Sequence, residues 1–129
     1  SLEETLDMLQ RLTDAWNIAA YALEDSLRSS PSTHAGLEVN NALLIGKVWE
    51  STLHAFQSYA VRSQWSDDKM PILQQIISRE AYLCTTALPL LEKDPRQGWH
   101  GEAQHYLFSA KMIKEKIQIL NRLFRSGPQ

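Results

Sequence analysis

Apolar residues recur at steps of three and four along most of this sequence, and this spacing most constrains the fold. The first such segment runs from about residue 2 to residue 28 and follows the 3.6-residue period of an α-helix. Its apolar positions are Leu2, Leu6, Leu9, Leu12, Trp16, Ala19, Ala20, Leu23 and Leu27. No alternation of the β type persists anywhere in the sequence. The pattern therefore predicts an all-α fold.

Three more helices are predicted after a break at Pro31 and its small polar neighbours. The second runs from about 36 to 65, the third follows Ser66-Asp67-Asp68 and should be kinked or loosened at Pro89, and the last begins at Ser109. Short connections make the first three helices antiparallel neighbours. We predict an antiparallel up-down bundle of about four helices, with a long irregular loop before the last helix.

The second predicted helix is apolar around most of its circumference. Between Ala42 and Val61 its only charged residues are Lys47 and Glu50. A helix of this kind is usually buried on several sides. We expect it to be the central helix and also to dock its outer face on another domain.

The bulk properties set limits on the class of protein. A chain of 129 residues fits one domain, residues 1–129, and a start at Ser1 is expected for a fragment of a larger protein. A net charge of −2 gives no reason to expect nucleic acid or anionic lipid as a partner. No apolar run approaches the ~20 residues that cross a membrane, so no membrane partner is expected either.

Counting outward from the short turns places Arg11, His54 and Glu80 at about the same height on three neighbouring helices. Glu80 interrupts the apolar series of its helix, and a carboxylate on a core face must be paired because a lone buried charge is costly. We predict that these three residues form a structural polar tie. An acid/base site inside the bundle is the alternative.

The stretch Gly98–Tyr106 is the densest group of functional side chains. Aromatic faces with amide, imidazole and carboxylate groups suit a sugar, and binding residues concentrate on loops. The predicted ligand-binding residues are Trp99, His100, Glu102, His105 and Tyr106, with Asn40 and Asn41 at the same end of the bundle. The alternative is a loop that seals the core with Trp99 and Tyr106.

Metal and cofactor signals are weak. Glu102 and His105 have the E-x-x-H spacing of di-iron bundles, but the motif occurs only once because Glu50 and His54 are four apart. We predict no metal site, no cofactor and no catalytic residue. Cys84 lies on an apolar face as a small hydrophobic side chain. The lysines interleaved with Glu115 are expected on a solvated face; they are Lys111, Lys114 and Lys116.

Residues 87–102 and the helix at 112–117 carry a family resemblance. The stretch Ala87-Leu88-Pro89-Leu90-Leu91-Glu92-Lys93-Asp94-Pro95-Arg96-Gln97-Gly98-Trp99-His100-Gly101-Glu102 is followed by Tyr106-Leu107-Phe108 and by Met112-Ile113-Lys114-Glu115-Lys116-Ile117. This resembles the C-terminal helical region of bacterial glycoside hydrolases with a domain of unknown function 4838, similar to glycoside hydrolase family 163. The resemblance covers roughly the last two thirds of the chain. Gln97 departs from the Leu expected there.

The resemblance implies an accessory role. In such enzymes the chemistry belongs to a (β/α)-barrel that acts on N-acetylglucosamine-containing glycans, so this chain would be a non-catalytic helical domain that packs on the barrel and lends a loop to glycan binding. It also implies a secreted, periplasmic or cell-surface location in a bacterium. The expected partners are the catalytic domain of the same parent protein or a homodimer partner, and a glycan.

Two other functions are compatible with the residues. The chain could be a stand-alone helical interaction or dimerisation module that uses its second helix. It could also be a small metal-dependent helical-bundle enzyme that uses His100, Glu102 and His105, with Glu80.

Overall fold

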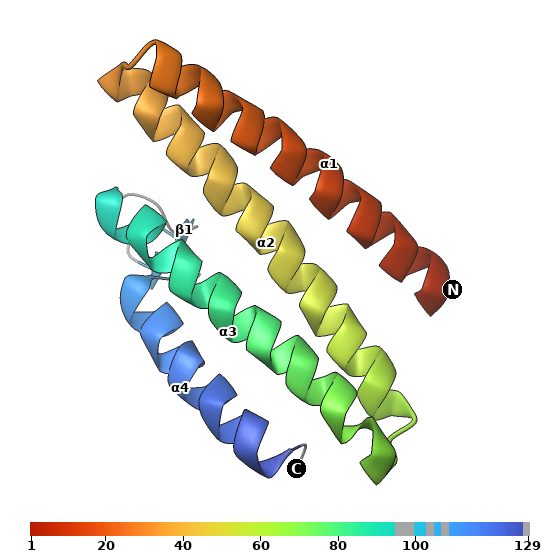
Figure 1. Cartoon of the computed structure of the whole chain (residues 1–129). Coiled ribbons are helices and arrows are strands. Elements are labelled where there is room, and N and C mark those ends of the chain that lie inside the picture. Colours follow the sequence, from red (N-terminus) through yellow and green to blue (C-terminus); the bar gives the residue numbers. More distant parts are fainter. Residues whose placement is uncertain (95–99, 103–104, 107–108, 128–129) are drawn as a thin grey trace. The chain divides into compact units, whose positions relative to one another are not determined.

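The computed structural model describes residues 1–94, 100–102, 105–106 and 109–127, and its fold is all-α. The four helices are α1 (Leu2–Ser29), α2 (Thr33–Ser63), α3 (Met70–Lys93) and α4 (Ala110–Ser126), as Figure 1 shows. A short 3₁₀ helix, η1 (Asp67–Lys69), precedes α3. Within the predicted loop, β1 (His100–Glu102) pairs antiparallel with β2 (His105–Tyr106). The predicted fold class is confirmed.

Local side-chain chemistry explains where the outer helices begin and end. Ser1 accepts a bond from the backbone N–H of Glu4 at 3.2 Å, and the Glu4 carboxylate accepts from the Ser1 amino group, which makes a capping box at the start of α1. Ser109 caps α4 in the same way by accepting from the Met112 N–H at 3.3 Å. Gly127 ends α4 with a φ of 73°, a conformation that favours glycine.

The middle of the chain differs in detail from the predicted boundaries. The second helix begins at Thr33, three residues before the predicted start. Ser66 does not cap a helix with its side chain but donates to the Asp68 carboxylate at the start of η1. α3 continues through Pro89 to Lys93, because Ala87 and Leu91 are both buried on this stretch and hold it against the core.

The chain divides into two compact units, Ser1–Leu53 and His54–Gln129, which we call the N-terminal and C-terminal units. In the N-terminal unit α1 and the first part of α2 run antiparallel as a helical hairpin (Figure 1). Its buried residues are Leu9, Thr13 and Ala20 on α1, and Val39, Asn40, Leu44, Gly46 and Leu53 on α2.

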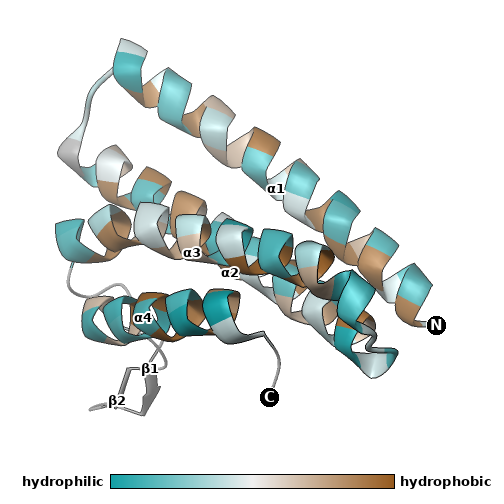
Figure 2. Ribbon diagram, turned by 60° about the horizontal axis from the view of Figure 1, so that its bottom comes forward, coloured by the Kyte–Doolittle hydropathy of each residue, from teal (hydrophilic) through white to brown (hydrophobic). Residues whose placement is uncertain are grey.

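The C-terminal unit contains the end of α2, then η1, α3 and α4. α3 supplies most of its core through Leu73, Ile76, Ile77, Leu83, Cys84, Ala87 and Leu91. α4 packs antiparallel to α3 and is strongly amphipathic, as the two-sided colouring in Figure 2 shows, yet no residue of α4 is fully buried. Gln74 fixes its end by donating to the Phe124 carbonyl at 3.1 Å.

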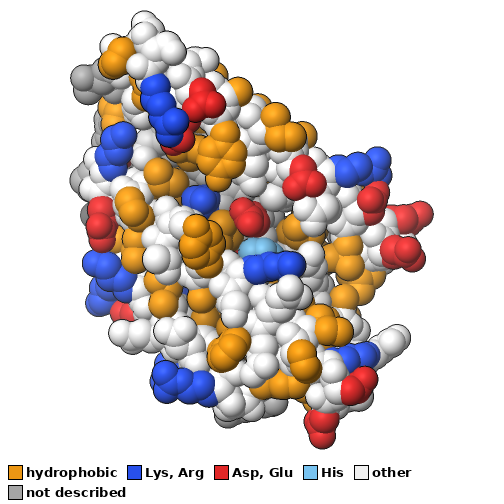
Figure 3. Space-filling model, viewed as in Figure 1, with side chains coloured by type: hydrophobic (Ala, Val, Ile, Leu, Met, Phe, Trp, Pro, Cys, Tyr) orange, Lys and Arg blue, Asp and Glu red, His pale blue; other side chains and the backbone are white. Residues whose placement is uncertain are grey.

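Hydrophobic side chains also remain at the surface, where they lie among charged ones in Figure 3. On α2, Phe56 and Tyr59 are exposed, so the expected docking of its outer face stays a prediction. Within the part of the chain that the structure describes, none of the helices has the length and apolar content that would let it cross a bilayer.

Candidate functional site: a buried carboxylate and an interhelical cleft

Glu80 places a carboxylate inside the apolar face of α3, where only 6% of the residue is exposed. Its Oε2 lies 2.6 Å from Nδ1 of His54 on α2, which is itself buried. An ionised carboxylate only accepts hydrogen bonds, so with Glu80 ionised the imidazole donates from Nδ1–H. This contact within the C-terminal unit is the one that the height count predicts.

Lys116 is the second partner of Glu80. Its Nζ donates to Oε1 of Glu80 at 2.6 Å and so ties α4 to α3, while 41% of the lysine side chain stays exposed. The prediction that Lys116 lies on a solvated face holds only in part, because its partly exposed side chain carries its charge to the buried carboxylate of Glu80.

Arg11 belongs to the N-terminal unit, so its place in the polar tie with His54 and Glu80 stays a prediction. It forms an exposed ion pair with Asp7, one turn earlier on the same helix. A guanidinium on a solvated helix face is paired at lowest cost with a carboxylate four residues away. Lys116 is therefore a cation that pairs with Glu80, a part that residue counting suggests for Arg11.

Cys84 lies one turn after Glu80 on α3, and its Sγ is 3.9 Å from Oε1 of Glu80. Burial raises the pKa of the Cys84 thiol to about 11; Lys116 opposes this shift and the charge of Glu80 adds to it. The thiol is therefore protonated at neutral pH, which fits the predicted small hydrophobic side chain and makes it a poor nucleophile.

We expect Cys84 to react with an aromatic disulfide reagent at pH 8 at least about 100-fold more slowly in the folded protein than in urea. Its folded pKa of about 11 exceeds the ordinary thiol value of 9.0. The contribution of the protonated Cys84 thiol to the free energy of unfolding is therefore complete below pH 9. It is lost as the pH rises towards 11, because in this range the thiol ionises in the unfolded chain but not in the folded one.

Urea unfolding of the wild type and of Cys84→Ala between pH 8 and 11 measures this effect. Above pH 9 the wild type should lose free energy of unfolding relative to Cys84→Ala, because the variant has no thiol to ionise. A constant difference over the whole range would contradict the assignment.

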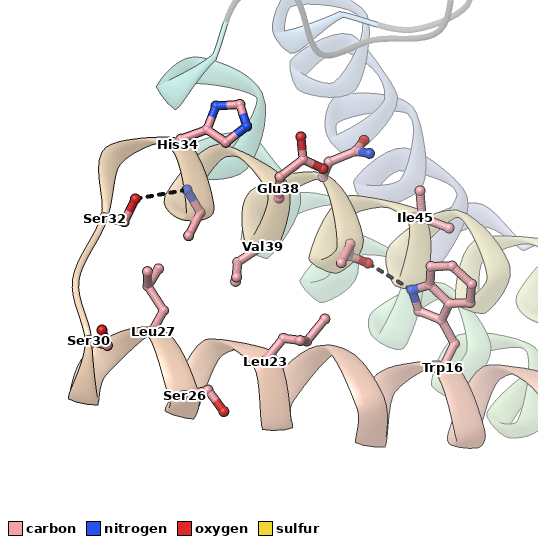
Figure 4. A pocket seen from close by; sticks show the side chains of 13 residues that line it. Trp16, Leu23, Ser26, Leu27, Ser30, Ser32, His34, Glu38, Val39 and Ile45 are labelled. Carbon is pink, nitrogen blue, oxygen red and sulfur yellow. Dashed lines mark hydrogen bonds between the residues drawn. The ribbon is translucent and has the colours of Figure 1, made fainter.

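A second candidate site is a cleft of about 700 Å³ in the N-terminal unit, between α1 and the first half of α2 (Figure 4). Leu23 and Leu27 rise from α1 and Val39 faces them from α2. Trp16 closes one end, and its Nε1 donates to the Ala42 carbonyl at 2.8 Å. The other residues of the lining are Ser26, Ser30, Ser32, His34, Ala35, Glu38, Asn41, Ala42 and Ile45.

The predicted ligand-binding residues are only partly located. Asn41 lines the cleft, whereas its neighbour Asn40 is 2% exposed and belongs to the core. Of the segment before α4, the structure gives the backbone of His100, Glu102, His105 and Tyr106 in the short hairpin of β1 and β2, and Trp99 lies outside the described residues. The two asparagines and the segment therefore stay a predicted site.

Within the described residues no group of three or more His, Cys, Asp and Glu side chains could hold a metal ion. The side chains of His100, Glu102 and His105 lie outside the described part of the chain, so the single E-x-x-H motif stays untested.

The chain matches no family model, no curated protein and no solved structure. Its function is therefore argued from its own residues and geometry.

Proposed function

We propose that the chain is a non-catalytic helical accessory domain of a carbohydrate-active enzyme, one that packs on a catalytic barrel and lends residues to glycan binding. The observation that carries this proposal is the residue pattern from Ala87 to Ile117, with Trp99, His100 and Glu102 at its centre. Aromatic, imidazole and carboxylate groups that follow one another in the sequence suit the C–H faces and hydroxyls of a sugar.

The helices on both sides of that segment are firmly tied, which supports the proposal. Glu80 and Glu92 of α3 pair with Lys116 and Lys114 of α4 at 2.6 and 3.2 Å. α4 also has its own N-cap at Ser109. The segment thus connects two helices that pair with each other, and binding residues commonly lie on segments that connect elements of a scaffold.

The non-catalytic part of the proposal rests on Glu80. Hydrolysis of a glycosidic bond needs two carboxyl groups that face each other across the sugar, about 5 to 9.5 Å apart. Glu80 is buried, and both of its oxygens accept from the side chains of His54 and Lys116. Its chemistry is that of a structural tie between helices.

A glycan array followed by NMR titration of the purified chain tests the sugar role. We expect binding to N-acetylglucosamine-containing oligosaccharides, and we expect Trp99→Ala to weaken it about tenfold, as loss of a stacking aromatic anchor commonly does. Tyr82→Ala is the matched control, because Tyr82 is an aromatic residue 72% exposed on α3.

Two results would remove the carbohydrate assignment. One is the absence of glycan binding together with unchanged affinity of the parent enzyme after Trp99→Ala. The other is a reading frame around Ser1 that encodes no barrel domain, which sequencing of the coding region decides.

A protein-interaction module is the second candidate, and the exposed apolar residues favour it. On α1, Met8, Leu12 and Leu23 are exposed and share one side of the helix with Ala15 and Ala19. A stripe of this kind is typical of a docking surface. Sedimentation equilibrium separates the cases: a monomer at all concentrations argues against self-association through these residues.

A further inference from the structure

The cleft of the N-terminal unit has an apolar floor between two helices of fixed spacing. Leu23, Leu27 and Val39 meet in it, as Figure 4 shows. Along α1 the lining extends from Trp16 to Ser30, which is about 20 Å at 1.5 Å per residue. A groove of this length and width between two helices is the shape that accepts a third, amphipathic helix.

A hydrogen bond lies at each end of the cleft, and the one at the Trp16 end joins α1 to α2. At one end Trp16 donates to the Ala42 carbonyl, and a Cβ added to Gly46 would stand 3.1 Å from Trp16 Cδ1. At the other end the Ala35 N–H donates to Ser32 Oγ at 3.4 Å and starts α2. The two helices are thus joined directly at the Trp16 end, and a groove fixed at one end lowers the cost of ordering a bound helix.

Most hydroxyl groups of the lining are already used by backbone. Ser26 donates to the Ala22 carbonyl at 3.0 Å, and Ser32 accepts from Ala35. The indole N–H of Trp16 is used as well. The polar side chains of the lining include His34, Glu38 and Asn41, while the floor of Leu23, Leu27 and Val39 matches an apolar side chain.

The net charge of the N-terminal unit indicates which charge a bound helix should carry on its polar side. Residues 1–53 contain eight acidic and three basic side chains, a net charge of −5. Arg11 is paired with Asp7, and Arg28 with Glu24 and Asp25. Glu38 is exposed on the α2 rim of the cleft, one turn after His34. Glu38 is the carboxylate of the lining, and it belongs to a unit of net charge −5, so the complement of this cleft is an apolar stripe with a cation beside that carboxylate.

We propose that the cleft between α1 and α2 binds a cationic amphipathic helix of a partner protein, with the apolar stripe of that helix on Leu23, Leu27 and Val39 and a lysine or arginine beside Glu38. This inference is independent of the carbohydrate proposal, because it uses neither the segment before α4 nor a sugar.

Two synthetic peptides of about 14 residues, long enough to span about 20 Å as helices, serve as probes. One contains only leucine and lysine in an amphipathic order, and the other has glutamate in place of lysine. In ¹H–¹⁵N NMR titrations of the full chain we expect the lysine peptide to shift the Trp16 indole signal and the amides of Leu23, Leu27 and Val39. The glutamate peptide should bind at least about tenfold more weakly.

Three variants sharpen the test. Glu38→Lys should weaken the lysine peptide about tenfold and strengthen the glutamate peptide. Asp14→Lys is its control, because Asp14 is exposed on α1 outside the lining and the change in net charge is the same. Ala35→Phe should fill the groove and weaken both peptides more than tenfold without a change in charge.

The proposal is overturned if the two peptides bind equally, if Asp14→Lys acts as strongly as Glu38→Lys, or if the shifted signals lie outside the cleft. It is also overturned if the cleft signals move with protein concentration alone, because the occupant is then a second copy of this chain. Circular dichroism should show the same helix content in each variant as in the wild type. A loss of binding is then due to the change in the cleft and not to unfolding.

Discussion

Replacing Lys116 by methionine should lower the free energy of unfolding by about 3 kcal/mol. The substitution keeps an apolar stem of similar length but removes the ammonium group that donates to Glu80 at 2.6 Å. A buried charge that loses one partner of a hydrogen-bonded pair is strongly destabilising, because less of its desolvation cost is then compensated. Urea denaturation followed by circular dichroism measures the effect.

Lys114→Met is a matched control for this prediction. Lys114 also lies on α4 and also pairs with a glutamate of α3, Glu92, at 3.2 Å, but both side chains of that pair are more than half exposed. We expect this variant to cost less than about 1 kcal/mol, since exposed pairs contribute little. Equal costs for the two lysine variants would show that the burial of Glu80 has no energetic weight.

Gly46→Ala should destabilise the protein by about 2 kcal/mol, the range of overpacked helix contacts. An added Cβ would stand 2.3 Å from Oδ1 of Asn17 and 3.1 Å from Cδ1 of Trp16. The asparagine can rotate away, but the indole is fixed by its bond to the Ala42 carbonyl. The two helices must therefore move apart at the closed end of the cleft.

The corresponding change at Gly36 should have the opposite sign. A Cβ there would meet Cδ2 of Leu27 at 3.8 Å, which is ordinary contact. Because alanine is the better helix former, Gly36→Ala should raise stability by about 0.5 to 1 kcal/mol. Thermal and urea unfolding of both variants decide this. The same sign at both positions would contradict the close approach of α1 and α2 at Gly46.

The helices could be predicted from sequence because their signals are local. Apolar spacing and caps such as Ser1 and Ser109 act within one or two turns, so they do not depend on the rest of the fold. The boundary near Thr33 was missed by three residues because it depends on a turn with several compatible conformations.

The buried tie could be predicted only in part, for a geometric reason. His54 and Glu80 lie on helices joined by a short turn, so counting residues from that turn gives their relative height. α4 follows a longer segment, so counting residues from the end of α3 does not give the heights of the α4 residues relative to those of α3. One signal could have identified Lys116: it interrupts the apolar series Ile113, Ile117, Leu120 and Leu123, just as Glu80 interrupts that of α3.

The cleft could not be predicted from the apolar pattern, because a cleft depends on where two helices separate. Trp16 and Gly46 together set the point of closest approach, and the open space follows from it towards Ser30. A large aromatic residue and a glycine at equal heights on two antiparallel helices would have been the pattern to look for.

The boundary between the two units has a consequence for anyone who wishes to divide this protein. It falls between Leu53 and His54, in the middle of α2, so cutting there would create two helix ends without caps and would orphan up to four backbone groups on each. Fragments that are meant to stay soluble should instead end in the turns at 30–32 or 64–66. A fragment of residues 1–63 keeps both α1 and the whole of α2, but it separates His54 from its buried partner Glu80.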